Sequence, residues 1–135
     1  MVRIDHVGIA VRDIDRALVF FTEVLGLEDG VRETVESQGL TIAFIPAGEG
    51  RLELLQPGGP DTPVGRFLET KGEGVHHIAF AVQSVEETLA RAKAAGYALI
   101  DEKPRPGAGG ARIAFVHPKS TSGVLVEFCE HDHDD

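Results

Sequence analysis

HVGIAVRDIDRAL at residues 6–18 is repeated as HIAFAVQSVEETL at residues 77–89, an offset of 71 (77 − 6). At the same offset, IAFI at 42–45 corresponds to IAFV at 113–116. Each copy of the pattern is shorter than 70 residues, which is too short to bury a comfortable core by itself. The chain therefore contains a duplicated unit, and the two copies are expected to pack together.

Each copy carries one histidine and one acid at matching places. His6 is followed by Glu53 in RLELL (53 − 6 = 47), and His77 by Glu127 in LVEFC (127 − 77 = 50). A buried carboxylate is costly unless it is paired or metal-bound. Two imidazoles and two carboxylates balance a divalent cation in charge and leave two of six positions open for water or substrate. The pattern indicates a metal site shared between the copies.

Strand alternation supports a cleft beside these histidines. Side chains point to opposite faces of a strand in turn, so each histidine shares its face with the small residues that follow it: Gly8 and Ala10 in the first copy, Ala79 and Ala81 in the second. Each residue taken singly has a plainer interpretation. A lone strand histidine is more often a hydrogen-bonded core residue, and a lone glutamate can face water at a sheet edge. The symmetric set of four favours metal binding.

The fold class predicted is α+β, with two tandem βαβββ modules whose curved mixed sheets surround a metal-binding cleft. Helices are predicted from the N-caps Asp13 and Ser84 to the glycines Gly26 and Gly96. The strands are expected at 4–11, 27–36, 40–46 and 51–56, and at 75–82, 97–101, 111–117 and 123–129. One domain, 1–135, would contain module one at about 3–57, a structured linker at about 58–73 with a short helix, module two at about 74–130, and an acidic, frayed tail at 130–135.

The composition is that of one globular domain. The chain has 135 residues, of which 42% are hydrophobic and 26% charged. A formal net charge of −9 argues against nucleic-acid and anionic-membrane partners. No apolar run approaches the roughly 18–20 residues of a membrane span, and no leader pattern precedes the first strand. The single cysteine, Cys129, excludes an internal disulfide framework, so a cytoplasmic location is expected.

Paired βαβββ units with His, Glu, His and Glu on equivalent strands resemble the vicinal oxygen chelate superfamily, in which a metal ion binds two substrate oxygens. Over nearly its whole length the chain resembles the methylmalonyl-CoA epimerases of that superfamily, through IDHVGIAV, GRLELLQP, GPDTPVGRFLETKGEGVHHIAF and DEKPRPGAGGARIAFVHPKSTSGVLVEF. The resemblance implies a homodimer and a divalent ion, Co²⁺ or Mn²⁺ first and Zn²⁺, Ni²⁺ or Fe²⁺ next. The ligands it implies are His6, Glu53, His77 and Glu127.

The implied reaction interconverts (R)- and (S)-methylmalonyl-CoA by removing and returning the C2 proton through a metal-stabilised enolate. Some relatives have Gln at the position of Glu53, so the present Glu adds a charge. Some also carry a proposed catalytic Glu at the position of Ile42, which has no titratable group. The remaining candidates are Glu127, Glu53, and Gln38 with an ordered water. Glu127 and Gln38 are predicted as catalytic, although metal binding lowers the basicity of a carboxylate.

A basic segment favours an anionic substrate. No acid occurs from Lys103 to Val126, in a chain whose net charge is −9. PRPGAGG at 104–110 is able to present backbone N–H groups to an anion, or is simply a glycine-rich connection. His117 has a plainer interpretation as a strand-end histidine bonded to backbone. The residues predicted to bind the CoA phosphates or the substrate carboxylate are Arg105, Gly107, Gly109, Arg112, His117 and Lys119.

Three other functions fit the same fold. A glyoxalase I-type lactoylglutathione lyase would use the same four ligands, but PRPGAGG and HPKS favour the epimerase. An extradiol dioxygenase needs two histidines, one carboxylate and three open positions, and four ligands leave too few. A metal-free small-molecule binding protein needs no ligand set, so the presence of all four residues counts against it.

Overall fold

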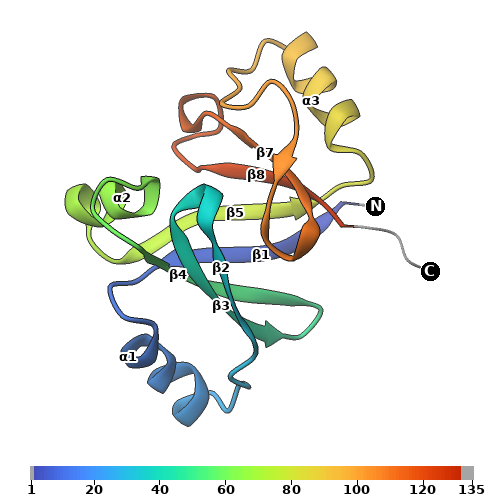
Figure 1. Ribbon diagram of the computed structural model, residues 1–135. Helices are drawn as coiled ribbons and strands as arrows, with labels where there is room; N and C mark the ends of the chain where they lie inside the picture. The colour runs from blue at the N-terminus through green and yellow to red at the C-terminus, as the bar shows by residue number, and fades with distance from the viewer. Residues whose placement is uncertain (1, 132–135) are drawn as a thin grey trace. The chain divides into compact units, whose positions relative to one another are not determined.

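The computed structural model describes residues 2–131, which fall into two compact units (Figure 1). One unit is His6–His76, and the other combines residues 2–5 with 77–131. Among residues 2–131, no helix has the length and apolar character needed to cross a membrane. The predicted module boundaries, which assign whole strands to each copy, stay a prediction.

The unit His6–His76 follows the predicted βαβββ order and adds the linker helix. Its sheet has the order β2-β3-β4-β1, in which β1 runs parallel to β4 and the other pairs are antiparallel. The elements are β1 (Arg3–Ala10, from His6 on in this unit), α1 (Ile14–Val19) with a π-helical continuation (Phe20–Val24), β2 (Arg32–Val35), a 3₁₀ turn (Glu36–Gln38), β3 (Leu40–Ala47), β4 (Gly50–Pro57) and α2 (Pro63–Lys71).

Helix α1 covers one face of this sheet. Asp13 caps it, because the Asp13 carboxylate accepts the Asp15 N–H at 2.9 Å. The buried core beneath the helix contains Val11, Ile14, Leu18, Ala43, Ile45 and Leu54. Strand alternation turns Glu53, the neighbour of Leu54, to the opposite face. The helix therefore takes the apolar face and leaves the Glu53 face for another use.

The second unit repeats the plan. Its sheet has the order β5-β8-β7-β6, with β5 parallel to β8 and the other pairs antiparallel. Ser84 caps its helix by accepting the Glu87 N–H at 3.1 Å. The elements are β5 (Gly74–Ala81, from His77 on in this unit), α3 (Val85–Ala94), β6 (Arg105–Pro106), a 3₁₀ turn (Ala108–Gly110), β7 (Arg112–Val116), a second 3₁₀ turn (Pro118–Ser120) and β8 (Val126–Glu130).

The α+β class is confirmed, but one predicted strand is wrong. Residues 97–101 form no strand, apart from one isolated bridge between Leu99 and Val116. The Asp101 carboxylate accepts the Phe115 N–H at 2.9 Å, so a side chain takes the place of a strand partner there. The ladder resumes only at β6, where Arg105 lies opposite Ile113. The prediction of a strand at 27–36 was also too long, since β2 covers Arg32–Val35.

The predicted fraying of the tail is wrong for its first two residues. Glu130 ends β8, and its carboxylate accepts the Val85 N–H at 2.9 Å at the start of α3. His131 Nε2 lies 2.9 Å from Asp5 Oδ1. The remaining four positions of the predicted tail, 132–135, lie outside the described residues. Long-range polar contacts hold the chain in place up to His131.

Candidate functional site: two buried histidine–glutamate pairs

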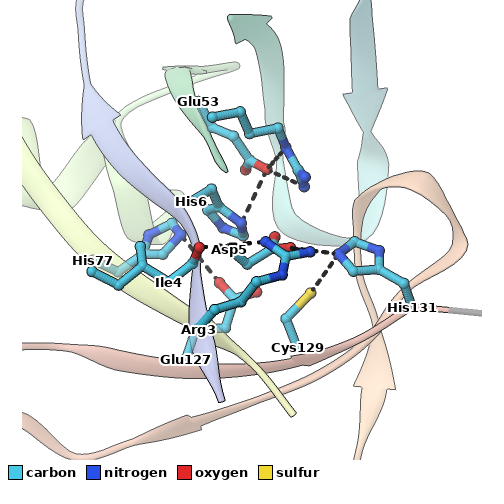
Figure 2. A network of polar contacts seen from close by, with 10 residues as sticks. Arg3, Ile4, Asp5, His6, Glu53, His77, Glu127, Cys129 and His131 are labelled. Carbon is cyan, nitrogen blue, oxygen red and sulfur yellow. Dashed lines mark hydrogen bonds and ion pairs between the residues drawn. The ribbon is translucent and has the colours of Figure 1, made fainter. Parts of the chain in front are cut away.

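In the unit His6–His76, parallel pairing of β1 with β4 brings a histidine beside an acid. The register sets Gly8 opposite Glu53 and His6 opposite Arg51. His6 Nδ1 lies 3.3 Å from Glu53 Oε2, and both residues are 3% exposed (Figure 2). Gly8, opposite Glu53, has no side chain and so leaves space into which the His6 and Glu53 side chains point.

In the second unit, β5 and β8 repeat this arrangement. The register sets Ala79 opposite Glu127, and His77 Nε2 lies 3.1 Å from Glu127 Oε1. Phe115 on β7 lies opposite Glu127, and its ring meets the His77 ring edge to face at 5.7 Å between centroids. The aromatic contact fixes the plane of the imidazole.

These pairs account for most of the buried polar side chains. Within residues 2–131, the buried polar or charged residues are Asp5, His6, Glu53, His77 and Glu127. Each pair offers one imidazole nitrogen and one carboxylate oxygen, a donor set that suits Zn²⁺, Co²⁺, Mn²⁺, Ni²⁺ or Fe²⁺. The residues present therefore fit a divalent metal ion in their donor chemistry, and the same donor pair is built once in each unit.

Arg51 is a contributor that the sequence analysis missed. Its guanidinium binds Glu53 Oε2 through Nη2 at 2.7 Å and Nε at 2.9 Å, and it lies over the Phe44 ring at 5.3 Å. A spacing of two residues places Arg51 and Glu53 on the same face of β4, which was the available signal. Where some relatives have a neutral Gln, this chain has Glu53, and Arg51 balances the added charge.

Removing this guanidinium should destabilise the metal-free protein. Arg51→Met leaves the Glu53 carboxylate, 3% exposed, without its cation, so the free energy of unfolding should fall by roughly 1–3 kcal/mol. Urea denaturation of the wild-type protein, Arg51→Met, Glu53→Gln and the double variant measures the coupling free energy between the two side chains. The double variant should be more stable than Arg51→Met, because a neutral Gln needs no cation. A double variant less stable than Arg51→Met would contradict this assignment.

The predicted catalytic residue Gln38 lies in the turn between β2 and β3. It is half-buried and ends the 3₁₀ turn Glu36–Gln38, before Gly39 in a left-handed conformation (φ 65°). Ile42 is 3% exposed on β3 and lies opposite Leu55. The register places Ile42 on the same face as Glu53, because Phe44, two residues on, lies opposite Glu53. This face therefore presents an apolar side chain where some relatives carry an acid.

Arg105 belongs to the surroundings of the His77–Glu127 pair. Its guanidinium lies over the Phe115 ring at 5.0 Å, and the same ring contacts the His77 ring edge to face. Arg105 Nε also lies 3.3 Å from Asp101 Oδ2, and the side chain is 42% exposed. A half-exposed cation positioned by an aromatic ring next to the buried pair is suited to bind an anionic group of a ligand.

The other predicted binding residues are distributed differently. Arg112 lies on the α3 side of β7, where Nη2 is 3.5 Å from Glu86 Oε1. His117 is exposed, and its Nδ1 accepts the Lys119 N–H at 3.1 Å. A Cβ on Gly107 would lie 2.8 Å from Ile113 Cγ2, so a side chain there would force Ile113 to shift. Gly109 adopts a left-handed conformation (φ 67°) in the turn that follows.

Comparison with known proteins agrees with this arrangement. Residues 5–115 match the family model described as Glyoxalase/Bleomycin resistance protein/Dioxygenase superfamily. The chain therefore belongs to that superfamily, and within it to the family of the methylmalonyl-CoA epimerases, which are isomerases.

Three proteins illustrate this membership. The ethylmalonyl-CoA/methylmalonyl-CoA epimerase of Cereibacter sphaeroides is 36% identical, over 93% of this chain and 95% of its own length. A methylmalonyl-CoA epimerase solved in complex with methylmalonyl-CoA and NH₄⁺ is 38% identical with a TM-score of 0.90, over 96% of this chain and 94% of that one. YqjC of Bacillus subtilis, an uncharacterized protein, is 49% identical, over 96% of this chain and 93% of its own length.

Proposed function

We propose that this protein interconverts (R)- and (S)-methylmalonyl-CoA, with a divalent metal ion held by His6, Glu53, His77 and Glu127. The observation that carries the proposal is the buried His–Glu pair, built once in each unit on equivalent strands, in a chain similar to methylmalonyl-CoA epimerases over more than nine-tenths of its length. Co²⁺ and Mn²⁺ are the first candidates for the ion. Following the resemblance and the single cysteine, we also propose a homodimer in the cytoplasm.

The substrate has an acidic C2 proton, because C2 lies between a thioester and a carboxylate. A divalent ion bound by the four side chains would supply a Lewis acid for the negative charge that develops on the thioester oxygen. Hydrogen bonds and burial hold each carboxylate in one orientation, as with Glu53 between Arg51 and His6. Such preorganisation avoids rearranging the site at the moment of reaction.

Epimerisation removes the C2 proton from one face and returns a proton to the other. We assign the removal to the Glu127 carboxylate, whose Oε1 faces His77 Nε2. For the opposite face we propose a water held by Gln38, since Ile42 has no acidic group. Glu127 takes the C2 proton on one face, and the water donates a different proton to C2 on the other face. Solvent then reprotonates the resulting hydroxide and takes up the proton held by Glu127, so no oxidant or further reactant is needed.

Arg105 is proposed to bind an anionic part of the substrate. Replacing it with methionine keeps an unbranched side chain on Phe115 but removes the charge, so KM should rise about tenfold, equivalent to roughly 1.4 kcal/mol of lost binding energy. The turnover number should change little, because Arg105 is not assigned to the proton transfer. Arg91→Met on α3 serves as the matched control. Equal KM values for the two variants would refute the role of Arg105.

The experiment that tests the function is deuterium uptake at C2 of methylmalonyl-CoA in D₂O, followed by mass spectrometry. It is run with metal-free protein and again after Co²⁺ or Mn²⁺ is restored. Fast, metal-dependent exchange together with interconversion of the two epimers is expected. Exchange no faster than in a protein-free control would overturn the epimerase proposal, and methylglyoxal with glutathione would then test the lactoylglutathione lyase alternative.

A further inference from the structure

Three potential metal ligands outside the two His–Glu pairs converge in the unit formed by residues 2–5 and 77–131. They are Asp5 on β1, Cys129 on β8 and His131 just after β8, and their ligand atoms all lie within 4.8 Å of one another. His131 Nε2 lies 2.9 Å from Asp5 Oδ1 and 3.4 Å from Cys129 Sγ (Figure 2). Because side chains alternate along a strand, Cys129 lies on the same face of β8 as Glu127, two residues further along.

The contacts of His131 differ from those of an ordinary hydrogen-bonded histidine. One nitrogen, Nε2, faces both the carboxylate and the thiol, and because a ring nitrogen carries at most one hydrogen, it can serve both groups only through a shared, weaker hydrogen bond. Asp5 and Cys129 are 2% and 1% exposed. Arg3 is one cation near Asp5: its Nη2 lies 3.8 Å from Asp5 Oδ1, and its side chain is 50% exposed to solvent. Three potential donor atoms within 4.8 Å of one another, two of them on buried residues, resemble the ligands of an ion.

The fold itself does not require this cluster, as the duplication shows. Counted from the corresponding histidines and acids, the unit His6–His76 has different residues at all three places: His76, Leu55 and Pro57. A βαβββ unit is thus built with neither a thiol nor a carboxylate at these positions. The cluster is a feature of one unit and needs a separate explanation.

The distances between the donor atoms suit a tetrahedral ion. With Zn–S of about 2.3 Å and Zn–N and Zn–O of about 2.0–2.1 Å, tetrahedral angles place S and N about 3.6 Å apart and N and O about 3.3 Å apart. The observed separations are 3.4 Å for Cys129 Sγ to His131 Nε2 and 2.9 Å for His131 Nε2 to Asp5 Oδ1. Shifts of a few tenths of an ångström, within the freedom of the half-exposed His131 side chain, bring these two separations to the tetrahedral values, and the Asp5 and Cys129 ligand atoms lie within 4.8 Å of each other.

We propose that Asp5, Cys129 and His131 bind a second divalent ion, Zn²⁺ by preference, separate from the metal of the proposed epimerase site. A thiolate, an imidazole and a carboxylate are a zinc donor set, and their two negative charges neutralise the ion. On binding, the thiol proton passes to solvent. The His131 side chain is 37% exposed, which provides an entry path and a fourth position for water.

The test uses cobalt as a spectroscopic probe of sulfur ligation. Metal-free, reduced protein is titrated with Co²⁺, and the thiolate-to-cobalt charge-transfer absorption in the near ultraviolet is recorded. The four residues of the epimerase site contain no sulfur, and Cys129 is the single cysteine of the chain, so this absorption reports Cys129 alone. The band should grow to a plateau, and added Zn²⁺ should bleach it.

Variants separate the second site from the first. Cys129→Ser should abolish the band, and Asp5→Asn and His131→Gln should each weaken the Co²⁺ affinity read from it by at least tenfold. His6→Gln should leave the band in place, because His6 belongs to the other donor set. Circular dichroism and thermal unfolding of the metal-free variants check their folding, and His131→Gln is the safest of them because its side chain is half-exposed.

Two outcomes would overturn the proposal. In one, Co²⁺ binds, as shown by its visible absorption, without any sulfur band in the wild-type protein. In the other, the band persists at unchanged affinity in both Asp5→Asn and His131→Gln, which would identify simple binding to a thiol. Neither result bears on the epimerase proposal, which is tested by C2 exchange.

Discussion

Replacing Glu127 with glutamine should lower the rate of C2 deuterium exchange by roughly 10²- to 10⁴-fold, the usual cost of losing a general base. Glutamine keeps the size of the side chain and a carbonyl oxygen, but it cannot accept the C2 proton. It also removes one of the two negative charges assigned to the metal ion. The variant should therefore lose activity even when Co²⁺ or Mn²⁺ is supplied in excess.

The matched control is Glu102→Gln, which removes a carboxylate 69% exposed that pairs with Lys93 in the same unit. That variant should exchange C2 deuterium at the wild-type rate. Metal content after dialysis, measured beside the exchange rate, separates loss of the ion from loss of the base. A folded Glu127→Gln protein with wild-type exchange would exclude Glu127 from both assigned roles.

Truncating Leu54 to alanine should lower the free energy of unfolding by about 2–5 kcal/mol, as is usual for a buried Leu→Ala change. Leu54 is 0% exposed and packs in the core under α1 with Ile14 and Leu18. The loss combines the missing apolar contact with a cavity that the helix cannot fully close. Urea denaturation of the metal-free protein measures it.

Val24→Ala provides the comparison, since Val24 is 68% exposed and its truncation should change stability by less than about 0.5 kcal/mol. Leu54 and its neighbour Glu53 point to opposite faces of β4, so the folded Leu54→Ala protein should keep most of its exchange rate. A loss of stability below about 1 kcal/mol would show that α1 does not depend on this core. The two predictions together test whether the faces of the sheet are divided between stability and chemistry.

Arg51 shows how a charge can be accommodated at a position that is neutral in some relatives. The extra carboxylate of Glu53 would be costly to bury alone, and the same strand supplies its cation two residues earlier. The buried charge of Glu53 is thus balanced by a neighbour on the same face. Position 42 differs, because β3 contains no Arg or Lys that could pair with a glutamate there. The residue present, Ile42, is buried opposite Leu55.

The sequence by itself determined the repeated βαβββ plan, the helix caps and the identity of the two histidines and two glutamates that correspond between the copies. These depend on local rules, namely the period of two along a strand, capping by Asp13 and Ser84, and an internal repeat that can be read without any partner. The resemblance to the methylmalonyl-CoA epimerases could also be recognised from the sequence alone, because it depends on long continuous stretches of residues. The residues of each pair could be named because the duplication marked them twice.

Only the tertiary structure decided which distant side chains meet. In the structure Arg105 lies over Phe115, and Arg112 lies near Glu86. The strand expected at 97–101 does not form, and the strand paired with β7 at that edge is Arg105–Pro106. It also joined Asp5 to Cys129 through His131, although Asp5 and His131 are 126 residues apart. Strand register and the paths of loops fix such contacts, and neither leaves a periodic signal in the sequence.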